Sequence, residues 1–185
     1  MEWDDFDYSR TKEMRERFVP IDAVKSFVNL KNGQSLIDVG AGDGSYAIAF
    51  ASANPDSKIT ALEPGRNGSA MIKKQISASG IKNIKVIEEN ACNVREYGPY
   101  DKVFFSNVFH DLECRDELLK RMSDSMKSGS EAIFIEFKKD AEFGPPVHIR
   151  ISERELESML KKAGFKLAAS AELEIHYMHK YALKK

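Results

Sequence analysis

One short stretch limits what this chain can fold into more than any other part of its sequence. An apolar run from Ser35 ends in Asp38, glycines follow at positions 40, 42 and 44, and a helical pattern begins at Ser45. This order predicts a strand, a tight turn and the first turn of a helix. Glycines let the backbone pass close to a ligand, and a helix start offers free N–H groups. The carboxylate of Asp38 would repel a phosphate, and it favours a ligand with a positive group.

Strand-like and helical segments alternate along most of the chain. Apolar runs predict strands over 35–39, 58–62, 85–88, 100–106 and 131–137, and helical spacing of apolar residues fills the intervals between them. A capping-box pattern at Ser152 and Glu155 predicts a further helix, and alternation over 165–183 predicts two strands in a hairpin. Strands separated by helices predict a mostly parallel sheet with helices on both faces, to which the last two strands add an antiparallel pair.

The composition fits one globular domain. The chain has 185 residues, 42% of them hydrophobic, and a formal net charge of −1. This length is typical of one domain with a full core, so residues 1–185 are expected to form a single domain. The balanced charge gives no electrostatic signal for nucleic acid or for a membrane surface.

The sequence carries no recognisable export or membrane signal. Residues 1–5 are acidic rather than apolar, and no apolar run reaches the ~20 residues of a membrane span. We therefore expect a cytoplasmic protein. Cys92 and Cys114 lack CxxC spacing, and they are expected to be reduced thiols rather than a redox pair or metal ligands.

Two segments outside the alternating pattern are candidates for covering a site. Residues 1–19 combine charged with aromatic side chains, including Trp3, Phe6 and Tyr8, and a short helix is predicted over about 11–17. This segment is interpreted either as a frayed arm or as a lid that closes over a pocket. Residues 138–151 form an irregular stretch, which we expect to lie on the substrate side.

In an open α/β sheet, ligands bind outside the carboxyl ends of the strands. In this sequence those ends carry the polar residues Asp38, Glu63, Asn90, Ser106, Asn107, His110, Asp111, Glu136 and Lys138. Glu63 lies about 20 residues beyond the glycine turn, which is the spacing of a carboxylate that accepts hydrogen bonds from a ribose diol. This spacing indicates a ligand with a nucleoside. Alternatively, Glu63 interacts only with the dipole of the helix that follows it.

A glycine turn of this kind also occurs in nicotinamide-dependent oxidoreductases, which form one alternative function. Three features disfavour a dinucleotide. Ser45 stands where the dinucleotide pattern has glycine or alanine, Asp38 would repel a pyrophosphate, and two strands at the C-terminus are foreign to that fold.

Taken together and in order, these motifs resemble the class I S-adenosylmethionine-dependent methyltransferases over essentially the whole chain. Residues 38–44 resemble the first motif of that family, Glu63 the acid that ends its second strand, and Asn90–Ala91 a pair near the adenine. Residues 101–112 resemble the fourth motif of the small quinone-biosynthesis-like branch, and residues 144–152 a segment of small prokaryotic members. The resemblance implies a Rossmann-like, doubly wound, seven-stranded sheet of strand order 3-2-1-4-5-7-6, mostly parallel, with an antiparallel C-terminal strand.

The resemblance further implies S-adenosylmethionine as cofactor and S-adenosylhomocysteine as product. Asp38 would face the methionine ammonium, and Glu63 would hold the ribose hydroxyls. Asn90 would bind the adenine amine, without the charge of the aspartate that the family often has there. The implied cofactor-binding residues are Asp38, Gly40, Ala41, Gly42, Gly44, Glu63, Pro64, Asn90, Ala91, Ser106 and Asn107, and no metal is implied.

The acceptor side offers fewer signals. His110 is the leading candidate for a general base if the acceptor must lose a proton, and otherwise it caps the next helix or packs over the ligand. His148 and Arg150 alternate on a segment expected to be extended, where they would face a polar or anionic acceptor. Alternatively, Arg150 pairs with Glu136 or Glu155 and holds the loop. Further wall candidates, each alternatively a packing residue, are Tyr8, Tyr46, His176 and Tyr177.

The predicted function is methyl transfer to an unidentified acceptor by in-line displacement. A small molecule is the expected acceptor, because the sequence shows neither an added RNA-binding domain nor a basic stripe. A protein or nucleic-acid acceptor is the alternative, since Lys and Arg can cluster in space. A further alternative is a methyltransferase-fold protein that binds the cofactor without transferring its methyl group, or that serves as a subunit of a larger enzyme. Either a monomer or a homodimer is compatible with the sequence.

Overall fold

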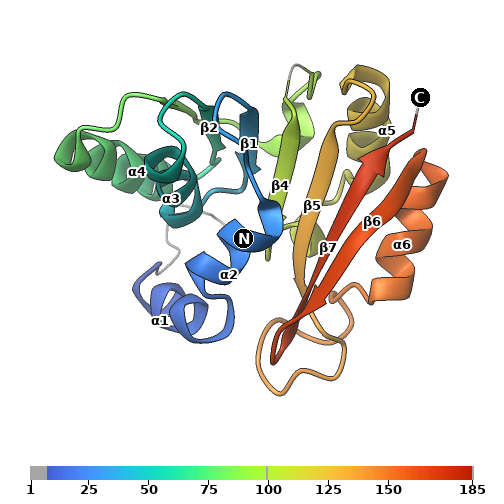
Figure 1. Ribbon diagram of the computed structural model, residues 1–185. Helices are drawn as coiled ribbons and strands as arrows, with labels where there is room; N and C mark the ends of the chain where they lie inside the picture. Colours follow the sequence, from blue (N-terminus) through green and yellow to red (C-terminus); the bar gives the residue numbers. More distant parts are fainter. Residues whose placement is uncertain (1–7, 99, 185) are drawn as a thin grey trace.

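The computed structural model describes residues 8–98 and 100–184, with side chains from residue 12 onward. Its strands form one seven-stranded sheet in the order β3-β2-β1-β4-β5-β7-β6, so the predicted fold and strand order are confirmed (Figure 1). The strands are β1 (Ser35–Val39), β2 (Lys58–Leu62), β3 (Ile84–Ile87), β4 (Lys102–Ser106), β5 (Glu131–Phe137), β6 (Phe165–Glu172) and β7 (His176–Leu183). The helices are α1 (Tyr8–Phe18), α2 (Ile21–Val28), α3 (Ser45–Ala53), α4 (Arg66–Ser79), α5 (Arg115–Ser125) and α6 (Glu153–Lys162), with short 3-10 turns η2 (Ala91–Asn93) and η3 (Phe109–Asp111).

Strand direction brings the polar strand ends to one edge of the sheet. Strands β1 to β5 are parallel, and β7 runs antiparallel between β5 and β6. Across four neighbouring strands, Asp38 of β1 pairs with Phe104 of β4, which pairs with Ile133 of β5, which in turn pairs with Lys180 of β7. The carboxyl ends of β1 to β5 therefore lie along the same edge as the first residues of β7, and this edge is called the carboxyl edge below.

The two faces of the sheet are covered by different helices. One core cluster joins the sheet to α5 and α6 through side chains such as Met122 and Leu160. The other joins it to α1, α2, α3 and α4 through Phe18, Val24 and Phe50, among others. Figure 1 shows α2 and α3 on one side of the sheet and α5 and α6 on the other. Side chains alternate between the faces along each strand, so each strand contributes to both cores.

Local signals explain how the last helix begins. Ser152 caps α6 by accepting the N–H of Glu155, and Glu155 in turn accepts the N–H of Ser152, so the predicted capping box is confirmed. In contrast, the next long helix, α5, begins at Arg115 with Cys114 before it, so His110 does not cap it as the alternative prediction had it. Among the described residues, no helix is both long and apolar enough to cross a membrane.

The expectation of two reduced thiols is wrong, because Cys92 and Cys114 form a disulfide. Cys92 belongs to η2, which follows β3, and Cys114 directly precedes α5, so both lie on segments that leave the carboxyl edge. Their Cα atoms are 5.7 Å apart although the residues are 22 positions apart in the chain. Spacing alone could not show this pairing, because it depends on how the fold places two loops. Arg121 Nη1 strengthens the same contact by donating to the Cys92 carbonyl at 2.8 Å.

Reduction of this disulfide is expected to lower the free energy of unfolding by about 3 kcal/mol, because the bond removes loop-closure entropy from the unfolded chain. Urea unfolding with and without a phosphine reductant measures this difference. The double variant Cys92→Ala/Cys114→Ala is the control: its stability should match that of the reduced wild type and should not respond to reductant. Equal stability of the oxidised and reduced wild type would contradict the expectation.

Candidate functional site

The glycine turn after β1 is packed tightly on both of its sides. Gly40, Gly42 and Gly44 all have positive φ angles, of 69°, 57° and 80°. A Cβ atom at Gly40 would lie 2.5 Å from Val108, and one at Gly44 would lie 2.6 Å from Ile72. Both the backbone conformation and the space therefore require glycine at these two positions.

Glu63 connects the end of β2 to the glycine turn. Its side chain is buried, and its carboxylate accepts the N–H of Gly42 at 2.7 Å and the N–H of Gly65 at 2.9 Å. The N–H groups of Gly40 and Ala41 donate to the carbonyl of Leu62 at 2.8 and 3.0 Å. The structure thus brings together the predicted acid, the glycine turn and, directly after Glu63, the half-buried Pro64.

Asp38 is a buried carboxylate that lacks a full set of partners. The residue is 2% exposed, and its Oδ2 has no hydrogen-bond partner among the described residues. Burial and the charges of Glu63 and Asp43 raise the pKa of Asp38 to about 7, although a backbone hydrogen bond from Ala47 and the charge of Arg15 act in the opposite direction. A positively charged ligand would relieve this electrostatic penalty.

Asn107 supplies a second buried oxygen without a donor. Its backbone is left-handed, with a φ of 54°, and its N–H donates to the Ile135 carbonyl at 2.8 Å. Its side-chain Oδ1 is buried and has no partner within the described chain. Buried polar atoms are rarely left in this state. Together with Asp38 Oδ2, this oxygen fits a ligand that carries several N–H donors, as an ammonium group does.

Helix α1 is tied to the glycine turn by one arginine. Arg15 donates from Nη1 and Nη2 to the two carboxylate oxygens of Asp43 at 3.1 and 2.8 Å, and from Nη2 to Ser45 Oγ at 2.7 Å. The side chain of Arg15 is only 12% exposed and that of Asp43 only 5%. This link was not predicted from the sequence, because its partners are 28 residues apart and neither lies in a local motif with the other.

The predicted lid can be followed only in part. Helix α1 includes the predicted helical segment, and Phe18 at its end is buried in the core. Trp3 and Phe6 lie outside the described residues, as does the side chain of Tyr8. A closing motion therefore stays a prediction.

Asn90 and Ala91 stand at the end of β3, as expected. Asn90 Oδ1 accepts the N–H of Cys92 at 2.8 Å and so caps η2. Ala91 is buried, and its carbonyl accepts the hydroxyl of Tyr97 at 3.2 Å. An adenine amine that donates to Asn90 Oδ1 would have to share this oxygen with Cys92, and the adenine contact stays a prediction.

His110 and Glu136 form a buried pair at the carboxyl edge. His110 Nδ1 lies 2.6 Å from one carboxylate oxygen of Glu136, whose other oxygen accepts the backbone N–H groups of Phe109 and His110 at 3.0 and 3.3 Å. Burial lowers the pKa of His110, but the hydrogen bond and charge of Glu136, with the charge of Asp111, outweigh it, so this pKa lies above its ordinary value. Because Glu136 is the acceptor at Nδ1, the neutral ring carries its lone pair at Nε2.

His110 also lines a cavity of about 640 Å³ between η3, the 139–151 segment and α6. The exposed side chain of His148 lies on the wall of this cavity, so the structure brings these two predicted residues to one space. Ionisable side chains of both signs surround them, among them Arg115, Lys139 and Glu155. The cavity is therefore polar, with an apolar floor at Met159 and Ile151.

Arg150 also lies on the wall of this cavity, and its contact with an acceptor stays a prediction, but the extended segment predicted around it is wrong. Residues 147–149 form a turn rather than an extended segment, and Arg150 is buried. Its guanidinium donates to the carbonyls of Lys138, Lys139, Ala141, Phe143 and Pro145 at 2.7–3.4 Å. The side chain holds the 138–151 segment through backbone carbonyls, instead of through Glu136 or Glu155.

Two predicted wall tyrosines also act as packing residues. Tyr46 is buried against Phe104, and its hydroxyl donates to the Val19 carbonyl at 2.9 Å. Tyr177 is fully buried, and its hydroxyl donates to the Ile151 carbonyl at 2.9 Å. Both hydroxyl groups serve the fold, because each satisfies the carbonyl of a buried residue.

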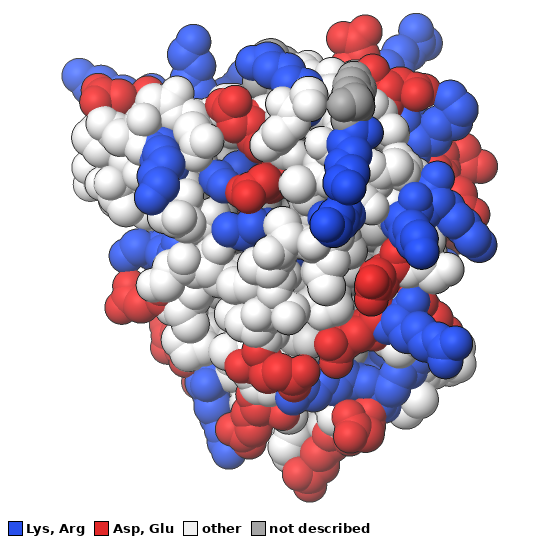
Figure 2. Space-filling model, turned by 45° about the vertical axis from the view of Figure 1, so that its right-hand side comes forward, with Lys and Arg blue, Asp and Glu red and all other residues white. Residues whose placement is uncertain are grey.

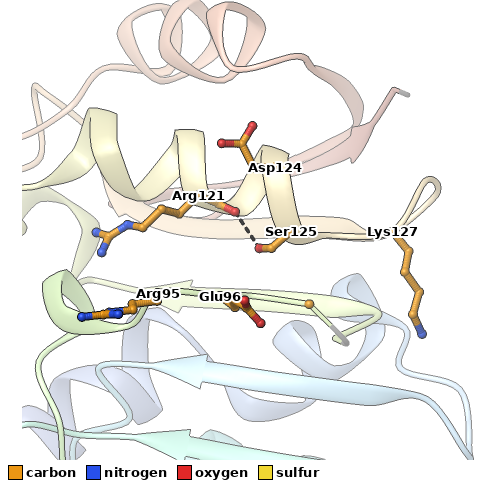
Figure 3. Close-up of a pocket in the computed structure, with 7 residues that line it drawn as sticks. Arg95, Glu96, Arg121, Asp124, Ser125 and Lys127 are labelled. Atoms are coloured by element: carbon orange, nitrogen blue, oxygen red, sulfur yellow. Dashed lines mark hydrogen bonds between the residues drawn. The ribbon is translucent and has the colours of Figure 1, made fainter.

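A second hollow lies between the segment before β4 and helix α5, and it holds none of the predicted site residues. It has a volume of about 600 Å³, and Arg95, Glu96, Arg121 and Lys127 are among its lining residues. Figure 3 shows Arg95 and Arg121 pointing to the same end of the hollow, while the Ser125 hydroxyl donates to the Arg121 carbonyl and accepts the N–H of Tyr97. This hollow is distinct from the carboxyl edge of the sheet.

Known proteins similar to this chain include methyltransferases of several kinds. A family model described as a methyltransferase domain matches residues 37–131, which run from β1 to the start of β5. A SAM-dependent methyltransferase structure from Aquifex aeolicus is 23% identical, with a TM-score of 0.83, covering 97% of this chain and 100% of that chain. That likeness concerns the fold.

Curated relatives match shorter parts of the chain. A tRNA1(Val) (adenine(37)-N6)-methyltransferase of Pseudoalteromonas translucida is 32% identical over 78 residues, which is 42% of this chain and 34% of that protein. A demethylmenaquinone methyltransferase of Bacillus mycoides is 27% identical over 123 residues, covering 63% of this chain and 50% of its own length. The chain therefore spans between about a third and a half of these two relatives, whose acceptors differ in kind.

The stability of the protein without ligand is expected to depend on the ionisation of Asp38. Since its pKa rises from 3.8 in the unfolded chain to about 7 in the folded protein, the unfolded state releases this proton first. Stability should then fall as the pH rises from about 4 to about 7, by roughly 4 kcal/mol for this group. Asp38→Asn lacks this penalty, so urea unfolding should show its advantage over the wild type growing with pH through this range. A difference that stays constant with pH would contradict the expectation.

The pKa of His110 is expected to depend on Glu136. Glu136→Gln keeps an oxygen for the two backbone N–H groups but removes the negative charge, so the pKa of His110 should fall. NMR titration of the imidazole carbon resonances measures this pKa in both proteins. Glu113→Gln, an exposed acid on the same cavity wall, is the matched control and should leave it unchanged. Equal values for the wild type and Glu136→Gln would show that the pair is not coupled.

Proposed function

The chain belongs to the methyltransferase domain family, and we propose that it transfers the methyl group of S-adenosylmethionine to a hydroxyl group of an acceptor. The observation that carries this proposal is the buried, unpartnered Oδ2 of Asp38 beside the glycine turn. A buried carboxylate oxygen of this kind suits a cationic ligand and disfavours a phosphate. We take residues 1–185 to be one domain in this proposal.

The residues present fit S-adenosylmethionine. Asp38 and Asn107 would accept hydrogen bonds from the methionine ammonium, and the Glu63 carboxylate would accept the ribose hydroxyls alongside the N–H groups of Gly42 and Gly65. Ala91 would offer its N–H to the adenine, and Asn90 would lie at the rim of the base. The cofactor supplies a sulfonium-bound methyl group that is already electrophilic.

The protein then has to orient the acceptor and remove its proton. The chain would hold the acceptor hydroxyl beside the electrophilic methyl group that the bound cofactor would supply, and the cofactor would leave as S-adenosylhomocysteine. His110 Nε2 takes the hydroxyl proton, since Nδ1 is engaged by Glu136. Glu136 stabilises the imidazolium that results and fixes the ring by its short contact. Orientation and proton removal are the two contributions that this chain makes.

A small molecule is the acceptor that we favour. On the face drawn in Figure 2, acidic and basic side chains are interspersed around an uncharged central area, and the described residues form no continuous basic band there. A nucleic-acid acceptor would call for such a band. The cavity beside His110 has room for a small molecule, and His148 lies at its wall, where we propose that it contacts the acceptor.

The cofactor assignment predicts that Asp38→Asn and Glu63→Gln each weaken binding of S-adenosylhomocysteine. Each change replaces a charge-assisted hydrogen bond by a neutral one, at a cost on the order of 1.5–3 kcal/mol. Isothermal titration calorimetry measures the affinities, with thermal unfolding as the check on folding. Glu88→Gln is the matched control, because Glu88 is an exposed acid that pairs with Lys73 on the surface, and it should bind as the wild type does.

Two results would overturn the proposal in different ways. Unchanged affinity in folded Asp38→Asn and Glu63→Gln proteins would refute the roles given to these carboxylates. Tight binding of S-adenosylhomocysteine without release of this product from S-adenosylmethionine, across a panel of hydroxylated acceptors, would instead favour a cofactor-binding protein without transferase activity. Binding of NADH in place of S-adenosylhomocysteine would favour an oxidoreductase.

A further inference from the structure

Two histidines on β7 are equally buried but differ in how their nitrogens are satisfied. His176 and His179 are each 3% exposed. His179 Nδ1 pairs with the Tyr181 hydroxyl at 2.8 Å, and its Nε2 lies 3.1 Å from Glu153. Neither ring nitrogen of His176 has a partner within the described part of the chain. Leaving a buried polar atom unpaired is unfavourable, so a histidine that served only for packing would be a poor choice here.

Strand geometry places His176 on the same face of the sheet as Asp38. Asp38 is in register with Phe104, Ile133 and Lys180, and Lys180 donates to the Val28 carbonyl of α2. His176 is four residues from Lys180, so its side chain points to this same face, at the carboxyl edge. His179 points to the opposite face, where Glu153 of α6 meets it. The unpartnered histidine is therefore the one on the Asp38 side.

The surroundings of His176 are aromatic and adjoin His110. The ring of Phe137 lies 4.1 Å from the ring of His176 and 6.3 Å from the ring of His110, measured between centroids. Gly144 packs so closely on Phe137 that a Cβ atom there would lie 2.6 Å from the ring. Nearby on the same segment, Phe143 contacts Phe18 of α1. Burial, and then the charges of His110 and Lys138, lower the pKa of His176 to about 4, so its ring is neutral at physiological pH.

We propose that His176 is an acceptor-binding residue, which holds a hydroxylated aromatic molecule by a hydrogen bond while the aromatic ring of that molecule packs against Phe137. A neutral imidazole offers one donor and one acceptor, so it can pair with a hydroxyl in either direction. Planar rings pack well on a phenylalanine in stacked or tilted geometry. This inference rests on the proposed function, because it takes the hydroxyl-bearing acceptor from it and adds the residue and the ring that recognise it.

The test measures binding of catechol to the protein saturated with S-adenosylhomocysteine. His176→Phe keeps a ring of similar size but removes both nitrogens, and it should bind catechol at least tenfold more weakly than the wild type. His176→Asn restores a donor and an acceptor, and it should recover most of the affinity. His179→Gln is the matched control on the opposite face of the same strand, and it should bind catechol as the wild type does. Affinity for S-adenosylhomocysteine should be unchanged in all three variants.

A second measurement does not depend on whether the variants fold. In the wild type saturated with S-adenosylhomocysteine, catechol should shift the imidazole nitrogen resonances of His176 and leave those of His179 in place. Absence of saturable catechol binding, equal binding by His176→Phe, or unmoved His176 resonances would each overturn the inference. Loss of S-adenosylhomocysteine binding by the wild type would instead refute the proposed function, so the two failures are distinguishable.

Discussion

Three buried carboxylates surround the glycine turn, and one guanidinium partly balances them. Asp38 ends its strand, Asp43 lies within the turn, and Glu63 follows β2, while Arg15 reaches across from α1. Glu63 and Asp43 have strong donors, namely two backbone N–H groups and the arginine. Asp38 has fewer hydrogen-bond donors, so burial and the excess negative charge raise its pKa. The turn is therefore built to be completed by a positive group.

The excess of negative charge at the glycine turn explains the position of helix α1. Removing water from Asp43 would be unfavourable without a cation, and Arg15 provides that cation from a segment that precedes the sheet. The same arginine donates a hydrogen bond to the hydroxyl of Ser45 at the start of α3. On the opposite face, the disulfide of Cys92 joins η2 to the loop before α5. The carboxyl edge is thus held from both faces, by an ion pair on one and by a covalent bond on the other.

Features that depend on neighbouring residues could be predicted from the sequence, and features that depend on the packing of distant segments could not. The strand, glycine turn and helix of 35–53 follow from adjacent residues, as does the capping box of Ser152. The order of the strands came from the resemblance to a family and not from local pattern. Arg15 had no local signal, and the contacts of Arg150 depend on backbone carbonyls of residues 138–145, which the spacing of His148 and Arg150 did not reveal. Polar residues at strand ends were easy to find, but their partners were not.

The two histidines at the carboxyl edge show how burial can produce opposite results in similar side chains. Burial removes both imidazole rings from water, which disfavours their charged forms. His110 lies against Glu136, which more than restores the charged form, so this ring is suited to gaining a proton. His176 has no carboxylate partner among the described residues, and the charges of His110 and Lys138 act against its protonation. If His110 becomes cationic as it takes the acceptor proton, the charge further disfavours protonation of His176, which keeps one ring available for a neutral hydrogen bond while the other changes its charge. A single carboxylate, placed against one imidazole and not the other, is enough to shift the pKa values of two buried histidines in opposite directions.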